Sequence, residues 1–392
     1  MTNKVVVAGV GMIPFTKPGA SLSYDLMGAQ AARLALEDAG VKYSAIQQAY
    51  AGYIYGDSCC GQRALYHVGL SGIALFNVNN NCSSGSTALF LARQAIQSGA
   101  IDVALVLGFE QMNPGALSSH YSDRPNAADP FIERCDALLD VAELPTALRI
   151  FGGAGLAHMQ RFGTPLQSFA KIRAKASRHA TRNPLAVFRK EVSPEDVLND
   201  QLLWPGVMTR LMACPPTCGA AAAVLCSEDY ARRHGLDARV WIAAQAMTTD
   251  DGRSFEEDLR YAAGYGMALS ASKQVYEAAG IGAEDIDVVE LHDCFAHNEL
   301  VTYEGLGLCP EGGAAKFIDD GDNTYGGRYV VNPSGGLLSK GHPIGATGLA
   351  QCYELTQQLR GNAEQRQVEG ARVALQHNVG IGGACVVTLY RN

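Results

Sequence analysis

The chain lacks an excess of positive charge and lacks any long apolar run. Its 392 residues carry a formal net charge of −8, whereas non-specific nucleic-acid binding needs a basic surface. The opening "MTNKVVVAGVGMIPF" contains too short an apolar run for a signal peptide or a membrane span. No later run without charges and glycines is long enough to cross a membrane. The sequence therefore predicts no nucleic-acid partner and no membrane span.

Metal-ligand spacing is absent as well. The eleven cysteines are an odd number scattered through a large chain, a usage typical of free thiols in a reducing compartment. Cys59 and Cys60 are adjacent, Cys214 and Cys218 frame "CPPTC", and no second pair stands at zinc-ribbon distance. We expect no metal site and interpret most of the thiols as small buried hydrophobic residues.

The overall composition is typical of a compact soluble globular protein. Hydrophobic residues make up 47% of the chain and charged residues 18%, and the length suggests about two to three domains. The 43 glycines indicate many tight turns and close backbone approaches.

Two pairs of segments share a template. The segments 37–46 and 277–286 both have an acidic start, an Ala-Gly helix end and an isoleucine at the same offset. Cys82 and His342 are each followed at the third place by a glycine, then by a helical run and an apolar strand. The matching order predicts a duplicated α/β unit.

The helical runs after Cys82 and His342 carry few charges near their starts. Only Arg93 interrupts residues 83–101, and a helix that is apolar on most sides is buried. If the two halves pack about a pseudo-twofold axis, the two helix starts meet in the middle. We therefore expect Cys82 and His342 to face one another.

The segment 118–212 matches neither copy and is interpreted as an excursion from the first half, which resumes near 218–235. The expected domains are an N-terminal half (1–117 and 213–265), a loop domain (118–212) and a C-terminal half (266–392).

Within this excursion, residues 161–190 hold eight basic side chains and no acidic one. Four of them fall on one helical face: Lys171, Lys175, Arg178 and Arg182. They form either a solvated helix face or a clamp for an anionic ligand with several phosphates.

Cys82 and His342 are the first candidates for chemistry. A thiolate at a helix start is stabilised by free backbone N–H groups, which lowers its pKa from about 8.5. His342 lies between Gly341 and Pro343 ahead of a second helix start. Within reach of Cys82 it would take the thiol proton and leave a thiolate–imidazolium pair. The alternative for Cys82 is an inert buried thiol.

Two further motifs add reactive groups. "ELHDCFAHNE" (290–299) places His292, Asp293, Cys294 and His297 at the end of a strand, where Asp293 or Asn298 could also act as a cap. "HNVGIGGACVV" (377–387) offers the unobstructed backbone N–H groups of an oxyanion hole at Gly380, Gly382 and Gly383. Cys385 in the following strand is interpreted as a structural thiol.

With Cys82, "HDCF" (292–295), "GHP" (341–343) and the glycine motif in this order, the chain resembles the thiolases over essentially its whole length. "VNNNCSSGSTALF" and "NPSGGLLSKGHPIGATGLAQC" are similar in particular to the sterol-carrier-protein type. The resemblance implies a five-layered αβαβα fold with an inserted loop domain. It implies acyl-CoA and CoA as substrates, no further cofactor, and a homodimer or homotetramer.

The resemblance also implies roles. Cys82 is the nucleophile, and His342 is its base, which with His292 holds the thioester oxygen. The backbone N–H groups of Cys82 and Gly380 form a second oxyanion hole. Ordinary thiolases have a second catalytic cysteine at the position of Asn378; in this branch that acid/base role falls on Cys294 of "HDCF" and not on Cys385.

The substrate-binding residues implied by the resemblance are less specific. His158 and Met159 resemble a pair that lines the pantetheine channel, and the basic run would lie in the domain that covers CoA. Phe295, Lys171 and Arg178 are further candidates. Cys218 stands where relatives usually have aspartate, which we interpret as a local structural change.

The predicted activity is thiolytic cleavage of a 3-oxoacyl-CoA through an acyl-cysteine, reversible as a Claisen condensation. Three alternatives stay open: a ketoacyl synthase, a retro-aldolase for sterol side-chain CoA esters, and a non-catalytic lipid-binding scaffold. The chain ends at "TLYRN" without an appended sterol-carrier domain or a Ser-Lys-Leu tail, from which we expect a cytoplasmic enzyme.

Overall fold

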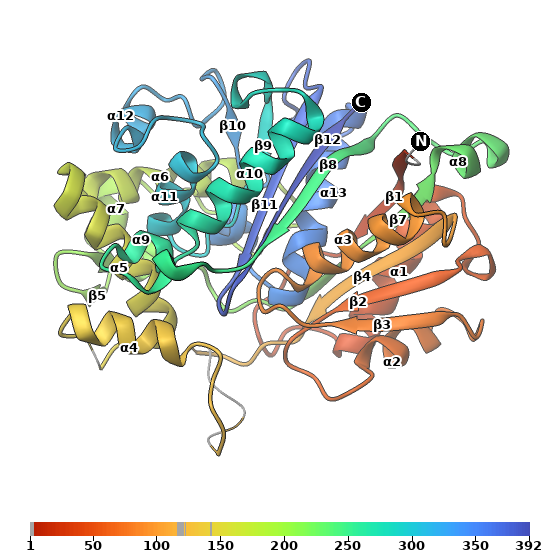
Figure 1. Cartoon of the computed structure of the whole chain (residues 1–392), viewed down its shortest axis with the longest axis horizontal. Helices are drawn as coiled ribbons and strands as arrows, with labels where there is room; N and C mark the ends of the chain where they lie inside the picture. Colours follow the sequence, from red (N-terminus) through yellow and green to blue (C-terminus); the bar gives the residue numbers. More distant parts are fainter. Residues whose placement is uncertain (1–3, 116–120, 122, 142) are drawn as a thin grey trace.

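The computed structural model describes residues 4–115, 121, 123–141 and 143–392. Ten strands form one sheet in the order β10-β9-β11-β12-β8-β1-β7-β4-β2-β3 (Figure 1). The strands of the first half are β1 (Val5–Met12), β2 (Gln48–Gly52), β3 (Ala74–Val78), β4 (Val103–Glu110) and β7 (Gly219–Ser227). Those of the second half are β8 (Trp241–Thr248), β9 (Val288–Glu290), β10 (Val330–Val331), β11 (Val373–Gly380) and β12 (Ala384–Arg391).

The two halves of the sheet have the same topology. In the first half β7 pairs antiparallel with both β1 and β4. β2 then pairs parallel with β4 on one side and with β3 on the other. In the second half β8, β12, β11, β9 and β10 repeat this pattern. The predicted duplication of an α/β unit is therefore confirmed. The halves join where β1 pairs with β8.

Helices cover the half-sheets and fill the space between them. In the first half these are α1 (Tyr24–Ala39), α2 (Cys60–Tyr66), α3 (Ser84–Gln97) and α8 (Glu228–His234). In the second half they are α9 (Leu259–Ala262), α10 (Tyr265–Ala279), α11 (Ala296–Gly305), α12 (Ala314–Asp319) and α13 (Thr347–Arg360). Within the described ranges, no helix is both long and apolar enough to cross a bilayer.

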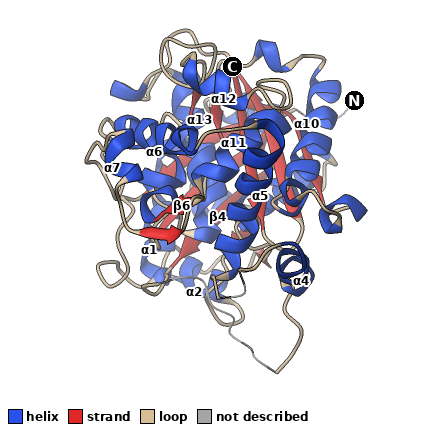
Figure 2. Cartoon of the chain, turned by 90° about the vertical axis from the view of Figure 1, so that its left-hand side faces the viewer, coloured by secondary structure: helices blue, strands red, loops and turns tan. Residues whose placement is uncertain are grey.

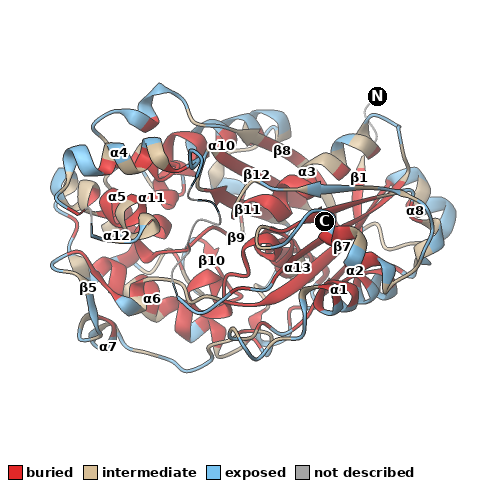
Figure 3. Cartoon of the chain, turned by 90° about the horizontal axis from the view of Figure 1, so that it is seen from below, coloured by how far each residue is buried: buried red, intermediate tan, exposed pale blue. Residues whose placement is uncertain are grey.

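Alternating side chains of β1 show how the layers arise. Val6 and Ala8 pack in the core that includes α1, whereas Val5 and Val7 pack in the core that includes α3 and α13. Successive strand residues point to opposite faces, so α1 and the α3/α13 pair cover opposite faces of the first half-sheet. α13 also contacts β11, and α10 covers β8 and β12, which completes the five layers. These central elements are buried along most of their length (Figure 3).

Glycines allow the starts of the two central helices to touch. A Cβ at Gly85 would lie 2.7 Å from the carbonyl oxygen of Gly345, and one at Gly348 would overlap Ser86. A side chain at either position would force the two segments apart. The expectation that the chain around Cys82 and the chain around His342 meet is confirmed.

The excursion between β4 and β7 is mainly helical, although residues 116–120, 122 and 142 lie outside the described part. It contains α4 (Asp129–Leu138), α5 (Thr146–Phe162), α6 (Leu166–Ala180), α7 (Pro194–Leu198) and the small hairpin β5 (Leu202–Trp204) and β6 (Met208–Thr209). α5 and α6 pack on α11 of the second half (Figure 2).

The first half resumes with β7, near the predicted position. β8, however, pairs with β12 and therefore belongs to the sheet of the second half. By strand pairing, the second half-sheet thus begins at β8, before the predicted boundary at 265. The reason is that β8 takes the place in the second half that β1 takes in the first.

Candidate functional site

Cys82 lies on a tight turn that leads into α3. Asn81 just before it adopts a left-handed backbone conformation with φ of 50°, which costs energy for a residue other than glycine. The N–H of Ser83 donates to the carbonyl of Asn80, and the N–H of Ser84 donates to that of Asn81. The turn holds the Cys82 side chain, 3% exposed, at the mouth of the helix.

Two histidine side chains from distant segments converge on Cys82. Its sulfur and one ring nitrogen each of His292 and His342 all lie within 4.8 Å of one another. The two imidazole rings meet edge to face, with centroids 5.0 Å apart. The predicted approach of the sulfur and the two histidines is therefore confirmed, and their catalytic roles remain a proposal.

One ring nitrogen of His342 is held by a hydrogen bond, and the other is free to accept a proton. Its Nδ1 lies 2.7 Å from the Thr347 hydroxyl, which donates its own proton to the carbonyl of Pro343. That hydroxyl therefore accepts the Nδ1 proton and leaves a lone pair on Nε2. Nε2 is buried and has no hydrogen-bond partner among the described residues. A buried lone pair beside a thiol is suited to accept its proton.

The loop 292–295 follows β9 and is tied to the segment that carries His342. The Asp293 carboxylate accepts hydrogen bonds from the backbone N–H groups of Leu337 (2.7 Å) and Leu338 (3.3 Å). The side-chain amide of Asn298 donates to the carbonyl of His292 at 2.5 Å. Of the two expected caps, Asp293 thus caps the turn ahead of His342, and Asn298 braces the loop itself.

One cavity of about 110 Å³ brings the reactive groups together. Cys82, Cys294 and His342 line it, and Phe295 lies in its wall as the sequence suggested. The remaining wall is mainly apolar and includes Met112, Leu148, Phe151, Ile344 and Ile381. Such a surface favours an apolar chain next to the reactive sulfur.

A third thiol, Cys214, also lines this cavity, and the sequence did not point to it. Its backbone N–H donates to the carbonyl of Cys294 at 2.8 Å, beside an antiparallel bridge between Ala213 and Phe295. Burial, followed by the nearby Cys214, raises the pKa of Cys294 well above its ordinary value. Cys294 is therefore a neutral thiol at neutral pH, with a proton to donate.

The resting protonation of Cys82 depends on its burial. Burial, followed by the Glu110 carboxylate, raises the pKa of Cys82 to about 12, although its own backbone and that of Ile381 lower it. Burial, followed by the charge of Lys340, lowers the pKa of His342 to about 3. Removal from water thus opposes the predicted thiolate–imidazolium pair and outweighs the helix start, so the pair stays a prediction.

Glu110, at the end of β4, is a second residue that the sequence analysis did not single out. Its carboxylate accepts hydrogen bonds from the backbone N–H groups of Tyr55 (2.9 Å), Ile54 (3.1 Å) and Gly345 (3.0 Å). It thereby ties the segment after His342 to the first half. Burial raises its pKa to about 7. In the sequence, the position of Glu110 at the end of an otherwise apolar strand could have indicated a functional residue.

Replacing Glu110 with glutamine should change how stability depends on pH. The folded pKa of about 7 exceeds the ordinary 4.5, so the contribution of Glu110 is fully present below about pH 4.5 and is lost as the pH rises through about 7. The uncharged variant lacks this loss. Urea unfolding at pH 5.5 and pH 8 should show a smaller decrease in unfolding free energy for Glu110→Gln than for the parent. Equal decreases in both proteins would contradict this assignment.

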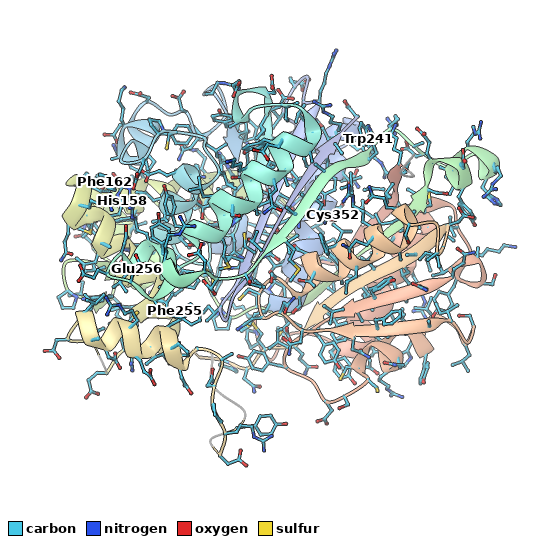
Figure 4. All side chains as sticks on the ribbon, viewed as in Figure 1. His158, Phe162, Trp241, Phe255, Glu256 and Cys352 are labelled. Atoms are coloured by element: carbon cyan, nitrogen blue, oxygen red, sulfur yellow. The ribbon has the colours of Figure 1, made fainter. Side chains whose placement is uncertain are left out.

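Neither His158 nor Met159 lines the cavity that holds Cys82, and their predicted place in a pantetheine channel stays a prediction. His158 is fully buried in α5, with its ring nitrogens 2.7 Å from the Thr164 hydroxyl and 2.8 Å from a carboxylate oxygen of Glu304. It packs beside Phe162, away from the centre of the molecule (Figure 4). The buried carboxylate of Glu304 needs a partner there, so His158 has a structural position.

The basic run does not form the predicted face. Lys175 is buried in an ion pair with Glu299, and Arg173 is buried against Ser339. Lys171 pairs with Asp319 at 2.7 Å at the surface, and Arg178 is exposed. None of these side chains lines the cavity that holds Cys82. Two of the four members of the predicted clamp, Lys171 and Lys175, are thus paired with carboxylates of the second half, and phosphate binding by Arg178 or Arg182 stays a prediction.

Comparison with known proteins gives a consistent result. The family model described as "Thiolase, N-terminal domain" matches residues 5–202, and "Thiolase C-terminal domain-like" matches residues 256–389. Sterol carrier protein 2 of Oryctolagus cuniculus is 51% identical over 393 residues, covering 99% of this chain and 72% of that protein. An acetyl-CoA acetyltransferase of Methanothermobacter thermautotrophicus is 32% identical, covering 98% of this chain and 99% of that protein.

Solved structures share the fold. The structure titled "Ltp2-ChsH2(DUF35) aldolase" superposes with a TM-score of 0.82 at 21% identity, covering 98% of this chain and 97% of that chain. At this identity the likeness establishes the architecture alone.

Proposed function

Because the chain belongs to the thiolase family, on its sterol-carrier-protein branch, we propose that it cleaves 3-oxoacyl-CoA with CoA through an acyl-Cys82 intermediate. The chain is thus an acyltransferase of thiolase type, with CoA as a substrate. The observation that carries the specific reaction is twofold. Ring nitrogens of His292 and His342 converge on the Cys82 sulfur, and Cys82, His342 and Cys294 line one cavity. No step of this chemistry requires a further cofactor.

The first half-reaction forms the acyl-enzyme. The Cys82 sulfur attacks the 3-keto carbon while its proton passes to Nε2 of His342. The Cα–Cβ bond then breaks, and its electron pair moves into the enolate of acetyl-CoA. His292 and the newly protonated His342 donate hydrogen bonds to the thioester oxygen of that enolate. Burial disfavours a charged His342, so proton transfer becomes favourable only as this oxygen gains negative charge.

Cys294 completes both half-reactions. Its thiol proton goes to the enolate carbon, which releases acetyl-CoA and leaves a Cys294 thiolate. That thiolate then takes the proton of incoming CoA, whose sulfur attacks the acyl-Cys82 thioester. The Cys82 sulfur leaves and regains its proton from His342, so the enzyme returns to its starting state. The raised pKa of Cys294 supports its starting role as an acid.

Gly380 is proposed to supply part of the second oxyanion hole, with the N–H of Cys82. A Cβ built on Gly380 would lie 3.2 Å from the backbone nitrogen of Cys82 and would also overlap the carbonyl of Asn80. A side chain there would separate the two backbone segments. The close approach of β11 to Cys82 supports this role.

The direct test is an assay of CoA-dependent loss of 3-oxoacyl-CoA across a series of straight, branched and steroid-side-chain acyl groups. The proposal expects acetyl-CoA as a product together with a shortened acyl-CoA. Cleavage of a 3-hydroxyacyl-CoA without CoA would favour a retro-aldolase instead, and transfer from a malonyl-carrier protein would favour a ketoacyl synthase. Binding of the esters without turnover would favour a lipid-binding scaffold.

We also propose a homo-oligomer built on the edge strand β3. This strand pairs only with β2 among the described strands, which leaves one row of backbone groups available for another chain. Apolar side chains gather around this edge, with Phe76 47% exposed and Leu70 82% exposed. A twofold axis at β3 would bury both in a symmetric interface.

Replacing Phe76 with arginine should therefore yield a monomer. Size-exclusion chromatography with light scattering is expected to give an even multiple of 41.6 kDa for the parent and 41.6 kDa for the variant, because a buried charge in each copy opposes pairing. Leu269→Arg, at a residue of α10 that is 40% exposed, serves as the matched control and should leave the mass unchanged. A parent that is itself monomeric would refute the interface.

The proposed compartment is the cytoplasm. All eleven cysteines, each in the described part of the chain, are free, which fits a reducing environment.

A further inference from the structure

A chain of buried hydrogen bonds begins at a backbone carbonyl and ends at His292. The side-chain nitrogen of Gln376 donates to the carbonyl of Gly348 at 2.8 Å. A carbonyl can only accept, so this contact fixes which end of the Gln376 amide is the nitrogen. The Tyr390 hydroxyl donates to the other end, the amide oxygen. The orientation of Gln376 is therefore determined from both sides.

Gln376 in turn determines the orientation of Asn378. The Gln376 nitrogen also donates to the Ser86 hydroxyl at 2.8 Å, and this hydroxyl donates its single proton to Oδ1 of Asn378 at 2.9 Å. The amide oxygen of Asn378 thus faces Ser86. Its nitrogen faces His292, where it lies 2.9 Å from Nδ1. Asn378, Gln376 and His292 are fully buried, so water does not compete for these contacts.

The contact with Asn378 determines the tautomer of His292. An amide nitrogen only donates, so Nδ1 of His292 accepts and the ring proton lies on Nε2. This Nε2 is buried and has no hydrogen-bond partner within the described ranges. His342 has the opposite arrangement, with a lone pair on Nε2. One ring nitrogen of each histidine lies within 4.8 Å of the Cys82 sulfur. Because Asn378 and Thr347 hold the two Nδ1 atoms, the unpartnered Nε2 atoms, one a donor and one an acceptor, are those left to act beside the sulfur.

We infer that Asn378 is a positioning residue that holds His292 as an N–H donor toward the reacting oxygen and, by the same contact, makes the site a poor metal ligand set. The first part rests on the proposed function; the second does not. A tetrahedral zinc site needs lone pairs from both imidazoles beside the thiolate. The Cys82, His292 and His342 cluster has the spacing for such a site but supplies only one of the two lone pairs.

Asn378→Asp is the variant that reverses this arrangement. A carboxylate has nearly the shape of the amide and still accepts the Ser86 proton, so the rest of the hydrogen-bond chain is kept. It cannot donate to Nδ1, so His292 must place its proton on Nδ1 and present a lone pair at Nε2. Loss of one oxyanion donor should lower kcat for thiolysis by about 100-fold with little change in KM.

The same variant should gain affinity for zinc. Equilibrium dialysis against Zn²⁺ followed by elemental analysis is expected to show at least about 10-fold tighter binding by Asn378→Asp than by the parent. Adding Cys82→Ala to the variant should remove this gain, which assigns the ion to the cluster. Nitrogen-15 spectra of histidine-labelled protein should show a protonated Nε2 on His292 in the parent and a protonated Nδ1 in the variant.

Two outcomes would overturn the inference. One is a parent protein in which His292 carries its proton on Nδ1, and the other is a folded Asn378→Asp variant with unchanged kcat and unchanged zinc affinity. If that variant does not fold, Ser86→Ala provides the test, because it frees the Asn378 amide to rotate. It should give a smaller loss of kcat and a mixture of both His292 tautomers, whereas a single unchanged tautomer would refute the inference. The zinc and spectral results stand even if the enzyme proves not to be a thiolase.

Discussion

Replacing Cys82 with alanine is expected to abolish turnover of 3-oxoacyl-CoA, by about 10⁴-fold or more, the scale on which removal of a nucleophile acts. The methyl group cannot attack the keto carbon, and it is the Cys82 sulfur that lies within 4.8 Å of a ring nitrogen of His342, the group that takes the thiol proton. Steady-state kinetics with saturating CoA, with circular dichroism to verify the fold, measures the effect.

Cys352→Ala is the matched control for this prediction. Cys352 is also a buried thiol, but it lies within α13 at the centre of the molecule and does not line the cavity (Figure 4). The control should keep most of its activity. A Cys82→Ala protein as active as Cys352→Ala would contradict the assignment of the nucleophile.

Replacing Cys294 with alanine is expected to separate the two halves of the reaction. Without its proton donor and later base, turnover should fall by about 10²- to 10⁴-fold, whereas the acyl group should still reach Cys82. Stopped incubation followed by intact-mass analysis should show acyl-enzyme that accumulates and is not released by CoA. The parent, which transfers the acyl group to CoA, should show little at steady state.

Cys385→Ala tests the alternative position for the second cysteine. Cys385 lies in β12, paired with Val379, and is fully buried outside the cavity lining. The variant should retain turnover. Loss of turnover in Cys385→Ala together with a fully active Cys294→Ala would return the acid/base role to the last glycine motif and would contradict the present account.

The sequence was informative wherever a local pattern repeats. The duplicated spacing from Cys82 to Gly85 and from His342 to Gly345 sufficed to predict two central helices whose starts meet. The glycines that made the pattern visible are the residues that allow this contact. The predicted boundary at 265 does not coincide with the start of the second half-sheet, because nothing in the short apolar run of β8 indicates which half-sheet it joins.

Long-range partners account for the rest. No residue near Lys175 in the sequence indicates that it forms a buried ion pair with Glu299. Likewise, no residue near His158 indicates its contact with the Glu304 carboxylate. The raised pKa of Cys82 likewise depends on burial by several segments and on Glu110, not on the helix start that follows it. Cys214 reaches the cavity through backbone pairing with the loop of Cys294, which its own motif does not reveal.

The central claim is that one sulfur, supported by two imidazoles from the other half of the chain, forms a covalent bond with the substrate. Incubating the parent with 3-oxohexanoyl-CoA in the absence of free CoA, then digesting and sequencing the peptides by mass spectrometry, tests it most directly. The account predicts a butyryl group on the peptide that contains Cys82. An unmodified Cys82, with the butyryl group on Cys214 or Cys294 or on no residue at all, would contradict it.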